Sequence, residues 1–409
     1  MSSILESVLL RIRVLGVLLI LLAGCGMAPM QGESDVMEKA KRVQELIPAW
    51  VNAGGDPNQI AALVRKVDGY LKAGNVQEAG RTLDEALDIL RTPPEPSSAP
   101  TTGKKTISLE GVHIGRASPA RLQKIPSWGS IIYNADGYLH VIQEDGSRVE
   151  RMTFDRPRQW EHVAASHDRR YIVANTQPNS TLWLFDLTEG VETQLAPDFA
   201  MAGEGGVAVD SAGYVYFSGK ATPHDLPDVY KIKLQGSRLT RLTDTPKTGE
   251  LDVSVSEDGQ LITYVTAFPD THTEIWVASS DGTGHRMVYR GGAGGVDSAH
   301  DPELSPDRSR VVFSVFNTKV APNYRHIPAA NTAHDLWVIN LDGTGLKRLT
   351  KPGPISIIPN WRGDSIVYTE ISERDNYSGA SVVSASGEDQ TPRRIKRGAS
   401  APKWLPKQP

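Results

Sequence analysis

The stretch that decides the fold is Pro302-Glu303-Leu304-Ser305-Pro306-Asp307-Arg308-Ser309-Arg310-Val311-Val312-Phe313-Ser314. It predicts a short strand, a tight turn and an apolar strand, because Pro, Asp and Ser favour turns whereas β-branched and aromatic residues favour strands. Weaker copies of this motif begin at Val163 and Val253. A unit that recurs along a chain indicates a repeat architecture.

A second motif lies between the copies of the first. It consists of a strand with alternating apolar and polar residues, a tight turn and another strand. Its clearest copy runs from Asp335 to Thr350, and the third residues of its six copies are 140, 183, 230, 276, 337 and 381. The intervals of 43, 47, 46, 61 and 44 residues match the period of a four-stranded propeller blade. We therefore predict a mainly β chain in which residues 105–406 form a six-bladed β-propeller of four-stranded antiparallel blades.

The two ends of this region resemble each other in sequence. Ala401-Pro402-Lys403-Trp404 echoes Ile125-Pro126-Ser127-Trp128. This similarity predicts that a strand from one end completes the blade begun by the other, which closes the ring and removes exposed sheet edges.

Together, Ser305-Pro306-Asp307 before an apolar strand and the string from Leu341 to Thr350 resemble the propeller repeats of the TolB family. For function, the resemblance implies only a related role in recognising a protein or a glycan, since propellers carry many activities. TolB proteins are soluble periplasmic proteins with an N-terminal α/β domain. The present sequence departs from that pattern, because its N-terminal part predicts a lipid anchor and helices.

The N-terminal residues indicate where in the cell the protein is located. Arg11 and Arg13 precede an apolar run over 14–23, which is too short to cross a bilayer and fits a secretory signal. The string Leu22-Ala23-Gly24-Cys25 resembles the bacterial lipoprotein box. This resemblance implies a signal peptide over 1–24, a tether over 25–32 and a lipid on Cys25, the only cysteine of the chain. With Gly26 next, it implies the periplasmic face of the outer membrane, or the plasma membrane in a monoderm.

Apolar residues between 33 and 91 recur with a helical period, which predicts a short helical segment before the propeller. Its three stripes are Val36, Ala40, Val43, Ile47 and Trp50; Ile60, Leu63, Val64, Val67 and Leu71; and Val76, Ala79, Leu83, Ala86 and Leu90. The string from Tyr70 to Leu87 resembles one tetratricopeptide hairpin. A three-helix packing element or a dimerisation segment is favoured over a peptide-binding repeat, since about three repeats are needed for a solenoid. The Pro-rich residues 92–104 predict a linker.

Composition and motifs limit the function classes. The 44 Lys and Arg against 48 Asp and Glu leave a net charge of −4, so we expect no nucleic-acid partner. The sequence contains neither a Gly-x-Ser-x-Gly elbow nor a phosphate-binding glycine loop, and we predict a protein that is not an enzyme and uses no cofactor.

Blade geometry predicts where binding residues gather. Tight turns join strands one and two and strands three and four on one face, so the remaining connections share the opposite face. The connections expected to be long are 219–227, 267–273, 290–299, 317–334 and 371–379. Function concentrates on such loops, which predicts a binding platform for an envelope protein or cell-wall glycan.

Alignment of the blades on the Ser-Pro-Asp position places Ile125, His162, Gly206, Asp252, Asp301 and Ile358 at the start of the innermost strands. We take Glu161, His162, Asp252, His300 and Asp301 as candidates for binding at the channel mouth. An ordinary polar channel rim is the favoured alternative for these side chains. A further alternative is a metal-dependent enzyme acting on polysaccharide, similar to oligogalacturonate-lyase-like propellers, with His162, His300 and Asp301 as ligands.

Overall fold

The computed structural model describes residues 31–52, 57–72, 75–91, 107–109, 114–177, 181–197, 199–201, 206–222, 225–235, 239–268, 272–291, 297–317, 334–388 and 390–407. The chain divides into two compact units, one of residues 1–99 with 292–294 and one of residues 100–291 with 295–409. Cys25, the predicted signal peptide and the whole of the predicted linker lie outside the described residues.

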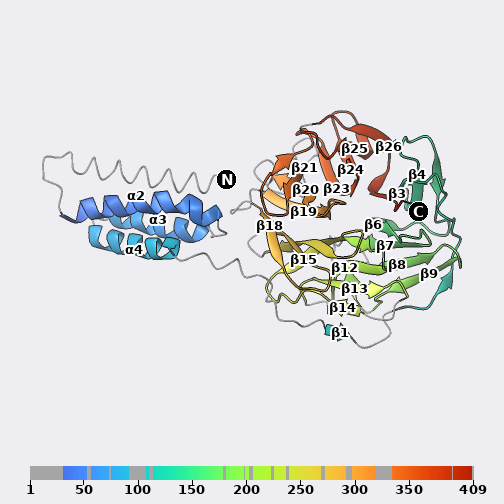
Figure 1. Ribbon diagram of the computed structural model, residues 1–409, viewed down its shortest axis with the longest axis horizontal. Helices are drawn as coiled ribbons and strands as arrows, with labels where there is room; N and C mark the ends of the chain where they lie inside the picture. The colour runs from blue at the N-terminus through green and yellow to red at the C-terminus, as the bar shows by residue number, and fades with distance from the viewer. Residues whose placement is uncertain are drawn as a thin grey trace. The chain divides into compact units, whose positions relative to one another are not determined.

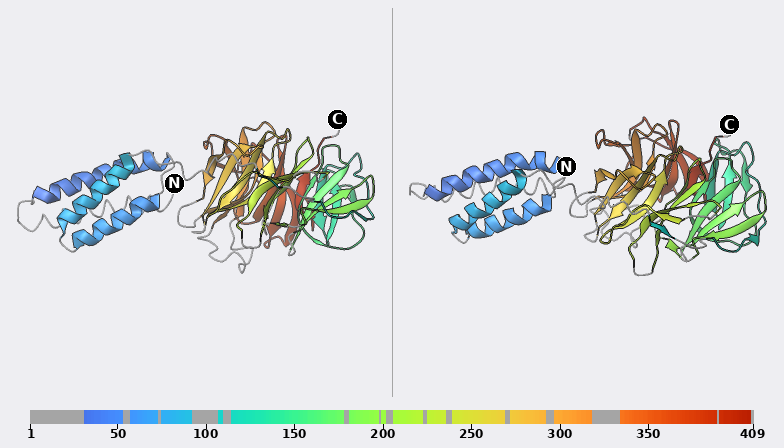
Figure 2. Two further views of the ribbon diagram at one scale, coloured as in Figure 1. Left: turned by 90° about the horizontal axis from the view of Figure 1, so that it is seen from below. Right: turned by 60° about the horizontal axis from the view of Figure 1, so that its bottom comes forward.

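The first unit contains three helices that lie side by side: α2 (Gln31–Asn52), α3 (Pro57–Lys72) and α4 (Val76–Arg91) (Figures 1 and 2). The apolar stripes form its core, as the periodicity predicts. Its buried members are Val36, Ala40, Val43, Ile47, Ile60, Leu63, Val64, Val67, Leu71, Ala79, Leu83, Ala86 and Leu90. Val76 is partly buried, and the Trp50 side chain lies outside the described set.

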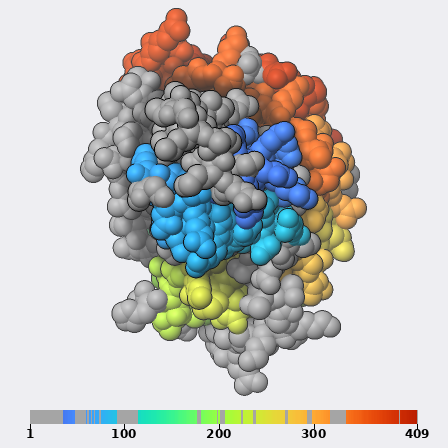
Figure 3. All heavy atoms as spheres, turned by 90° about the vertical axis from the view of Figure 1, so that its left-hand side faces the viewer, coloured from blue at the N-terminus to red at the C-terminus, as the bar shows by residue number. Residues whose placement is uncertain are grey.

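Polar contacts complete this unit. Lys39 Nζ lies 2.8 Å from both Asp35 Oδ2 and Asp84 Oδ2 and so joins α2 to α4. Asn75 Oδ1 accepts the Glu78 N–H at 3.3 Å and caps α4. Most charged side chains of α2 and α4 are exposed, whereas those of Lys39 and Glu78 are partly buried. Figure 3 shows the helices of this unit as spheres in shades of blue. Among the described helices, none has the length and apolar character needed to span a membrane.

The second unit is a propeller of six antiparallel sheets (Figure 1). We number the blades 1 to 6 along the chain and give the strands of each blade from the innermost to the outermost. The first three blades are blade 1, β27 (Ser400–Trp404), β3 (Ile131–Ala135), β4 (Tyr138–Ile142), β5 (Val149–Arg151); blade 2, β6 (Gln159–Ala165), β7 (Tyr171–Gln177), β8 (Leu182–Asp186), β9 (Val191–Leu195); and blade 3, β11 (Val207–Val209), β12 (Tyr214–Lys220), β13 (Asp228–Lys233), β14 (Leu239–Arg241), with β10 (Ala200–Met201) also paired to β12. The other three are blade 4, β15 (Gly249–Val255), β16 (Leu261–Ala267), β17 (Thr273–Ser279), β18 (Arg286–Arg290); blade 5, β19 (Asp297–Leu304), β20 (Arg310–Asn317), β21 (His334–Asn340), β22 (Lys347–Arg348); and blade 6, β23 (Ile355–Arg362), β24 (Ser365–Ser372), β25 (Tyr377–Ser384), β26 (Arg393–Arg397).

The ring is closed, as predicted. The innermost strands contact one another in the cyclic order β27, β6, β11, β15, β19, β23 and back to β27. The C-terminal β27 pairs with β3, and Arg169 of blade 2 donates hydrogen bonds to Pro406 O and Gly129 O. The alignment is wrong at one position: Ile125 precedes β3 and lies on no strand, and Ala401 of β27 occupies the innermost place.

The residues before β3 cover outer sheet edges. β1 (Ile107–Leu109) pairs with β14, β2 (Ser118–Pro119) pairs with β9, and Leu122 bridges Thr153 beside β5. Blades 1, 2 and 3 thus gain an additional strand or bridge at their outermost strand, which satisfies backbone groups that an exposed edge leaves unpaired.

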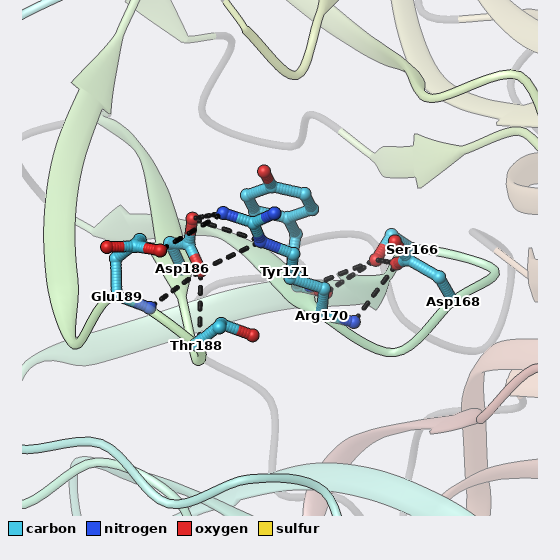
Figure 4. A network of polar contacts seen from close by, with 7 residues as sticks. All are labelled: Ser166, Asp168, Arg170, Tyr171, Asp186, Thr188 and Glu189. Atoms are coloured by element: carbon cyan, nitrogen blue, oxygen red, sulfur yellow. Dashed lines mark hydrogen bonds and ion pairs between the residues drawn. The ribbon is translucent and has the colours of Figure 1, made fainter.

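The tight turns of each blade gather on one side, here called the turn face. In blade 2, Arg170 Nη2 lies 2.7 Å from Asp186 Oδ2 and joins the turn after β6 to the turn after β8 (Figure 4). Ser166 Oγ donates to Asp168 Oδ1 within the first turn, and Asp186 Oδ1 accepts the Thr188 and Glu189 N–H groups in the second. These contacts place both turns on the same face.

The opposite side, here called the loop face, carries the other connections. One expectation is wrong there: residues 371–379 form no long loop, because β24 and β25 pair as far as Ser372 and Tyr377 and leave a turn of only residues 373–376. The connection in blade 4 runs from Ala267 to Thr273 as expected. Residues 318–333, which join β20 to β21, lie outside the described residues.

Candidate binding site in the central channel

A shared irregularity shapes the central channel. In blades 1, 2, 4, 5 and 6 the innermost strand carries one extra residue against its neighbour, which is a β-bulge. Asp252, Asp301, Ile358 and Ala401 open four of these bulges with φ values of 51°, 51°, 54° and 46°. Asp tolerates this left-handed conformation better than most non-glycine residues, which gives the two aspartates a structural reason to be there.

A cavity of about 390 Å³, including its solvent-open part, occupies the channel. All six innermost strands contribute to its lining. Its first layer contains His162, Gly206, Asp252, Asp301, Ile358 and Ala401, and its second contains Ser254, Glu303, Asn360 and Lys403. Gly206 leaves room for its neighbour, because an added Cβ would lie 2.6 Å from Val253 O.

The first-layer carboxylates connect adjacent blades. The Asp301 N–H donates to Asp252 Oδ2 at 3.2 Å, and the Ile358 N–H donates to Asp301 Oδ2 at 3.1 Å. Ser314 Oγ also donates to Asp301 Oδ2, at 3.0 Å. Each aspartate therefore accepts the N–H of the bulged residue in the next blade, and both lie where the sequence places them.

His162 lies in the first layer and is neutral at pH 7. Burial lowers its pKa to about 4, although nearby Asp301 opposes the shift, and the charge of Lys403 adds to it. Its backbone N–H donates to Asn175 Oδ1 at 2.8 Å, and Asn175 Nδ2 donates to Glu161 Oε2 at 2.9 Å. Glu161 thus contacts Asn175 of its own blade and is not among the residues that line the cavity.

The second layer is a hydrogen-bonded network centred on Glu303. Ser254 Oγ and Asn360 Nδ2 each donate to this carboxylate at 2.7 Å, and Lys403 Nζ lies 4.0 Å from it. Lys403 Nζ also donates to Val207 O at 3.1 Å. Burial raises the pKa of Glu303, while the charge of Lys403 and the two donors oppose that rise.

Sequence reasoning missed this second layer. Ser254, Glu303, Asn360 and Lys403 each follow a first-layer residue by two positions, so the signal was available in the repeat alignment. A period-two pattern beyond the bulge would have selected these four positions.

His300 lies beside the first layer but not in the cavity lining. Its Nε2 is 2.9 Å from Ser298 Oγ, and its Nδ1 is 3.8 Å from Asp252 Oδ2. His334 is buried nearby, and its pKa is lowered to about 4, first by burial and then by His300, with Asp301 opposing. Among the described residues, a group of three side chains has ligand atoms within 4.8 Å of one another: His162, Asp252 and Asp301.

Comparison with known proteins addresses the fold. No family model and no curated protein matches the sequence. Among solved structures, the crystal structure of TolB from Acinetobacter baumannii is similar at 15% identity, covering 68% of this chain and 67% of that one, with a TM-score of 0.50. The propeller is TolB-like.

Other proteins share this fold. A chain of the nidogen/laminin complex matches the TolB-like propeller at 12% identity, covering 68% of this chain and 99% of that one, with a TM-score of 0.51. Oligogalacturonate lyase in complex with manganese matches at 14% identity, covering 69% and 86%, with a TM-score of 0.45. At these identities the similarity concerns architecture alone, and function has to be argued from the site.

Proposed function

We propose that this chain is a bacterial envelope lipoprotein whose TolB-like propeller serves as a binding platform for an envelope protein or a cell-wall glycan. The observation that carries the proposal is the cavity in the channel, to which all six innermost strands contribute and whose lining includes the side chains of His162, Asp252, Ser254, Asp301, Glu303, Asn360 and Lys403. Its first layer holds two aspartates and a neutral histidine, which can accept and donate hydrogen bonds to a polar partner.

The proposed location in the envelope is inferred from the sequence around Cys25. A lipid on this residue would attach the chain to the membrane, and Gly26 after it favours the periplasmic face of the outer membrane. The anchor supplies membrane attachment, so the folded units need no membrane-binding surface of their own.

The variant Cys25→Ser tests the proposed membrane anchoring. We expect the variant to move from the membrane pellet to the soluble fraction, while its propeller unfolds at the same temperature as that of the unmodified protein. The measurement is fractionation followed by immunoblotting, with metabolic labelling by a fatty-acid analogue. Continued sedimentation of Cys25→Ser with the membranes would refute anchoring through this cysteine.

Binding is tested with the two partner classes separately. Purified protein is incubated with isolated peptidoglycan sacculi, or cross-linked in detergent-solubilised envelope, and Asp301→Ala is compared with Asp342→Ala. Asp342 makes the matched control, because it is exposed in a turn-face loop and loses the same charge. Loss of capture only in Asp301→Ala supports the channel site, whereas equal capture by both variants contradicts it.

A second candidate function is a metal-dependent enzyme acting on polysaccharide. It is favoured by the approach of His162, Asp252 and Asp301 to within 4.8 Å, since neutral imidazole and carboxylates are suitable ligands for a divalent ion. Such an ion would polarise a substrate oxygen. Metal analysis of the purified protein decides this: a stoichiometric ion that is lost in Asp252→Ala/Asp301→Ala supports the candidate, and a metal-free protein contradicts it.

A further inference from the structure

Ser298, His300 and Asp252 form a cluster at the loop-face end of the channel. Ser298 and His300 are two residues apart on β19, so they project from the same side of the strand. Ser298 Oγ lies 2.9 Å from His300 Nε2, and His300 Nδ1 lies 3.8 Å from Asp252 Oδ2 on the neighbouring blade. A hydroxyl, an imidazole and a carboxylate thus stand in the order that an activated serine requires.

We propose that Ser298 is a nucleophile, that His300 is its general base and that Asp252 is a positioning residue, so that the propeller hydrolyses small esters. This activity is additional to partner binding. Geometry supports the roles: the tautomer in which His300 Nε2 accepts from Ser298 carries its proton on Nδ1, the nitrogen that lies 3.8 Å from Asp252 Oδ2. Asp252 is 3% exposed and is held in place by the Asp301 N–H.

Thr273 supplies the donor that the reaction needs. Its hydroxyl accepts the Ala299 N–H at 2.6 Å and lies 3.4 Å from Ser298 Oγ. Because the Ala299 N–H occupies a lone pair of this oxygen, the hydroxyl proton can point toward Ser298 and stabilise negative charge on a substrate oxygen there.

The reaction balances without any further reagent. Ser298 Oγ forms a bond to the ester carbonyl carbon while its proton passes to His300 Nε2. The carbon–oxygen bond to the alcohol then breaks, and the alcohol leaves with the proton from His300. Water attacks the acyl group, passes a proton through His300 to Ser298 Oγ and releases the carboxylic acid.

The substrate class follows from the exposure of Ser298 and His300 and from the number of hydrogen-bond donors beside them. The His300 side chain is 27% exposed and Ser298 is half-buried, so a small acyl group can reach both. One hydroxyl donor gives less stabilisation of the tetrahedral intermediate than a pair of backbone N–H groups. Esters, which have better leaving groups than amides, are therefore the expected substrates.

A fluorophosphonate probe tests the proposal directly, since it phosphonylates serine hydroxyls that a base activates. We expect mass spectrometry of the full-length protein to locate the label on Ser298. The rate of labelling should fall by about 100-fold or more in His300→Ala, in line with the contribution of a general base. Asp252→Asn should label more slowly than the unmodified protein, and Asp252→Glu should recover part of the rate.

Ser147 is the matched control, because it is an exposed serine whose hydroxyl donates to the Asp145 carboxylate rather than to a histidine. Hydrolysis of p-nitrophenyl acetate should persist in Ser147→Ala and disappear in Ser298→Ala. Folding of each variant is checked by circular dichroism. An unlabelled Ser298 in the folded protein, or labelling that is unchanged in His300→Ala, would overturn the proposal and leave the sacculus and cross-linking tests of partner binding unaffected.

Discussion

At the turn face, Asp258 and Asp307 accept hydrogen bonds from the serine hydroxyl and the backbone N–H groups of their own turns. In the channel, Glu303 accepts hydrogen bonds from two other blades, and the C-terminal strand contributes a cation, Lys403, beside it. The pKa values move in opposite directions: those of Asp258 and Asp307 are lowered, and that of Glu303 is raised by burial.

This difference separates two uses of one functional group. A carboxylate in a solvated turn fixes the local backbone, and its removal affects a few residues. A carboxylate in the channel joins blades that are distant in sequence and has a large desolvation cost. The channel is therefore where substitutions should have the larger effects, and equivalent changes at the turn face provide the controls.

The largest effect is expected from Lys403→Met, which leaves Glu303 in the channel without its cation. Removal of one partner of a buried pair costs about 3 kcal/mol. The counterpart is Arg308→Met, which breaks the exposed 2.7 Å pair with Asp258 and should cost about 0.5 kcal/mol or less. Urea unfolding followed by tryptophan fluorescence measures both.

A double variant sharpens this test. Lys403→Met/Glu303→Gln removes the charge that the single variant leaves uncompensated, so it should be more stable than Lys403→Met alone. If Lys403→Met and Arg308→Met cost the same, the distinction between the two regions is wrong.

An intermediate effect is expected from Gly206→Ala. The added Cβ would lie 2.6 Å from Val253 O, and backbone of the adjacent blade would have to move, at a cost of about 2 kcal/mol. The control is Gly69→Ala in α3, where an added Cβ meets nothing within 4 Å and the exchange favours the helix. Thermal unfolding monitored by calorimetry would contradict the prediction if both variants unfolded as the unmodified protein does.

The repeats made the propeller predictable, because each copy of Ser-Pro-Asp and Asp-Gly marks a turn at nearly the same interval. Asp252, Asp301 and His162 followed from the alignment of the copies. Glu303 and Lys403 lie two positions further along the same strands, where a period-two pattern applied to the aligned copies would have selected them. Residues 373–376 resemble loop residues in composition, and only the pairing of Ser372 with Tyr377 reveals a tight hairpin.

The smallest effect is expected in the pH dependence of stability, where the two regions should differ in sign. The pKa of Glu303 is raised from its ordinary value of 4.5. The stabilisation that its protonated carboxyl gives to the folded state is therefore fully present below pH 4.5 and is lost as the pH rises through the raised pKa. The pKa of Asp307 is lowered from 3.8, so its contribution is present above pH 3.8 and is lost as the pH falls through the lowered value. Urea midpoints between pH 3 and pH 8 should therefore show that Glu303→Gln is relatively more stable at high pH and that Asp307→Asn is relatively more stable at low pH. Parallel curves for the two variants would mean that both carboxylates act as local turn contacts, which would remove the physical basis for treating the channel as a separate site.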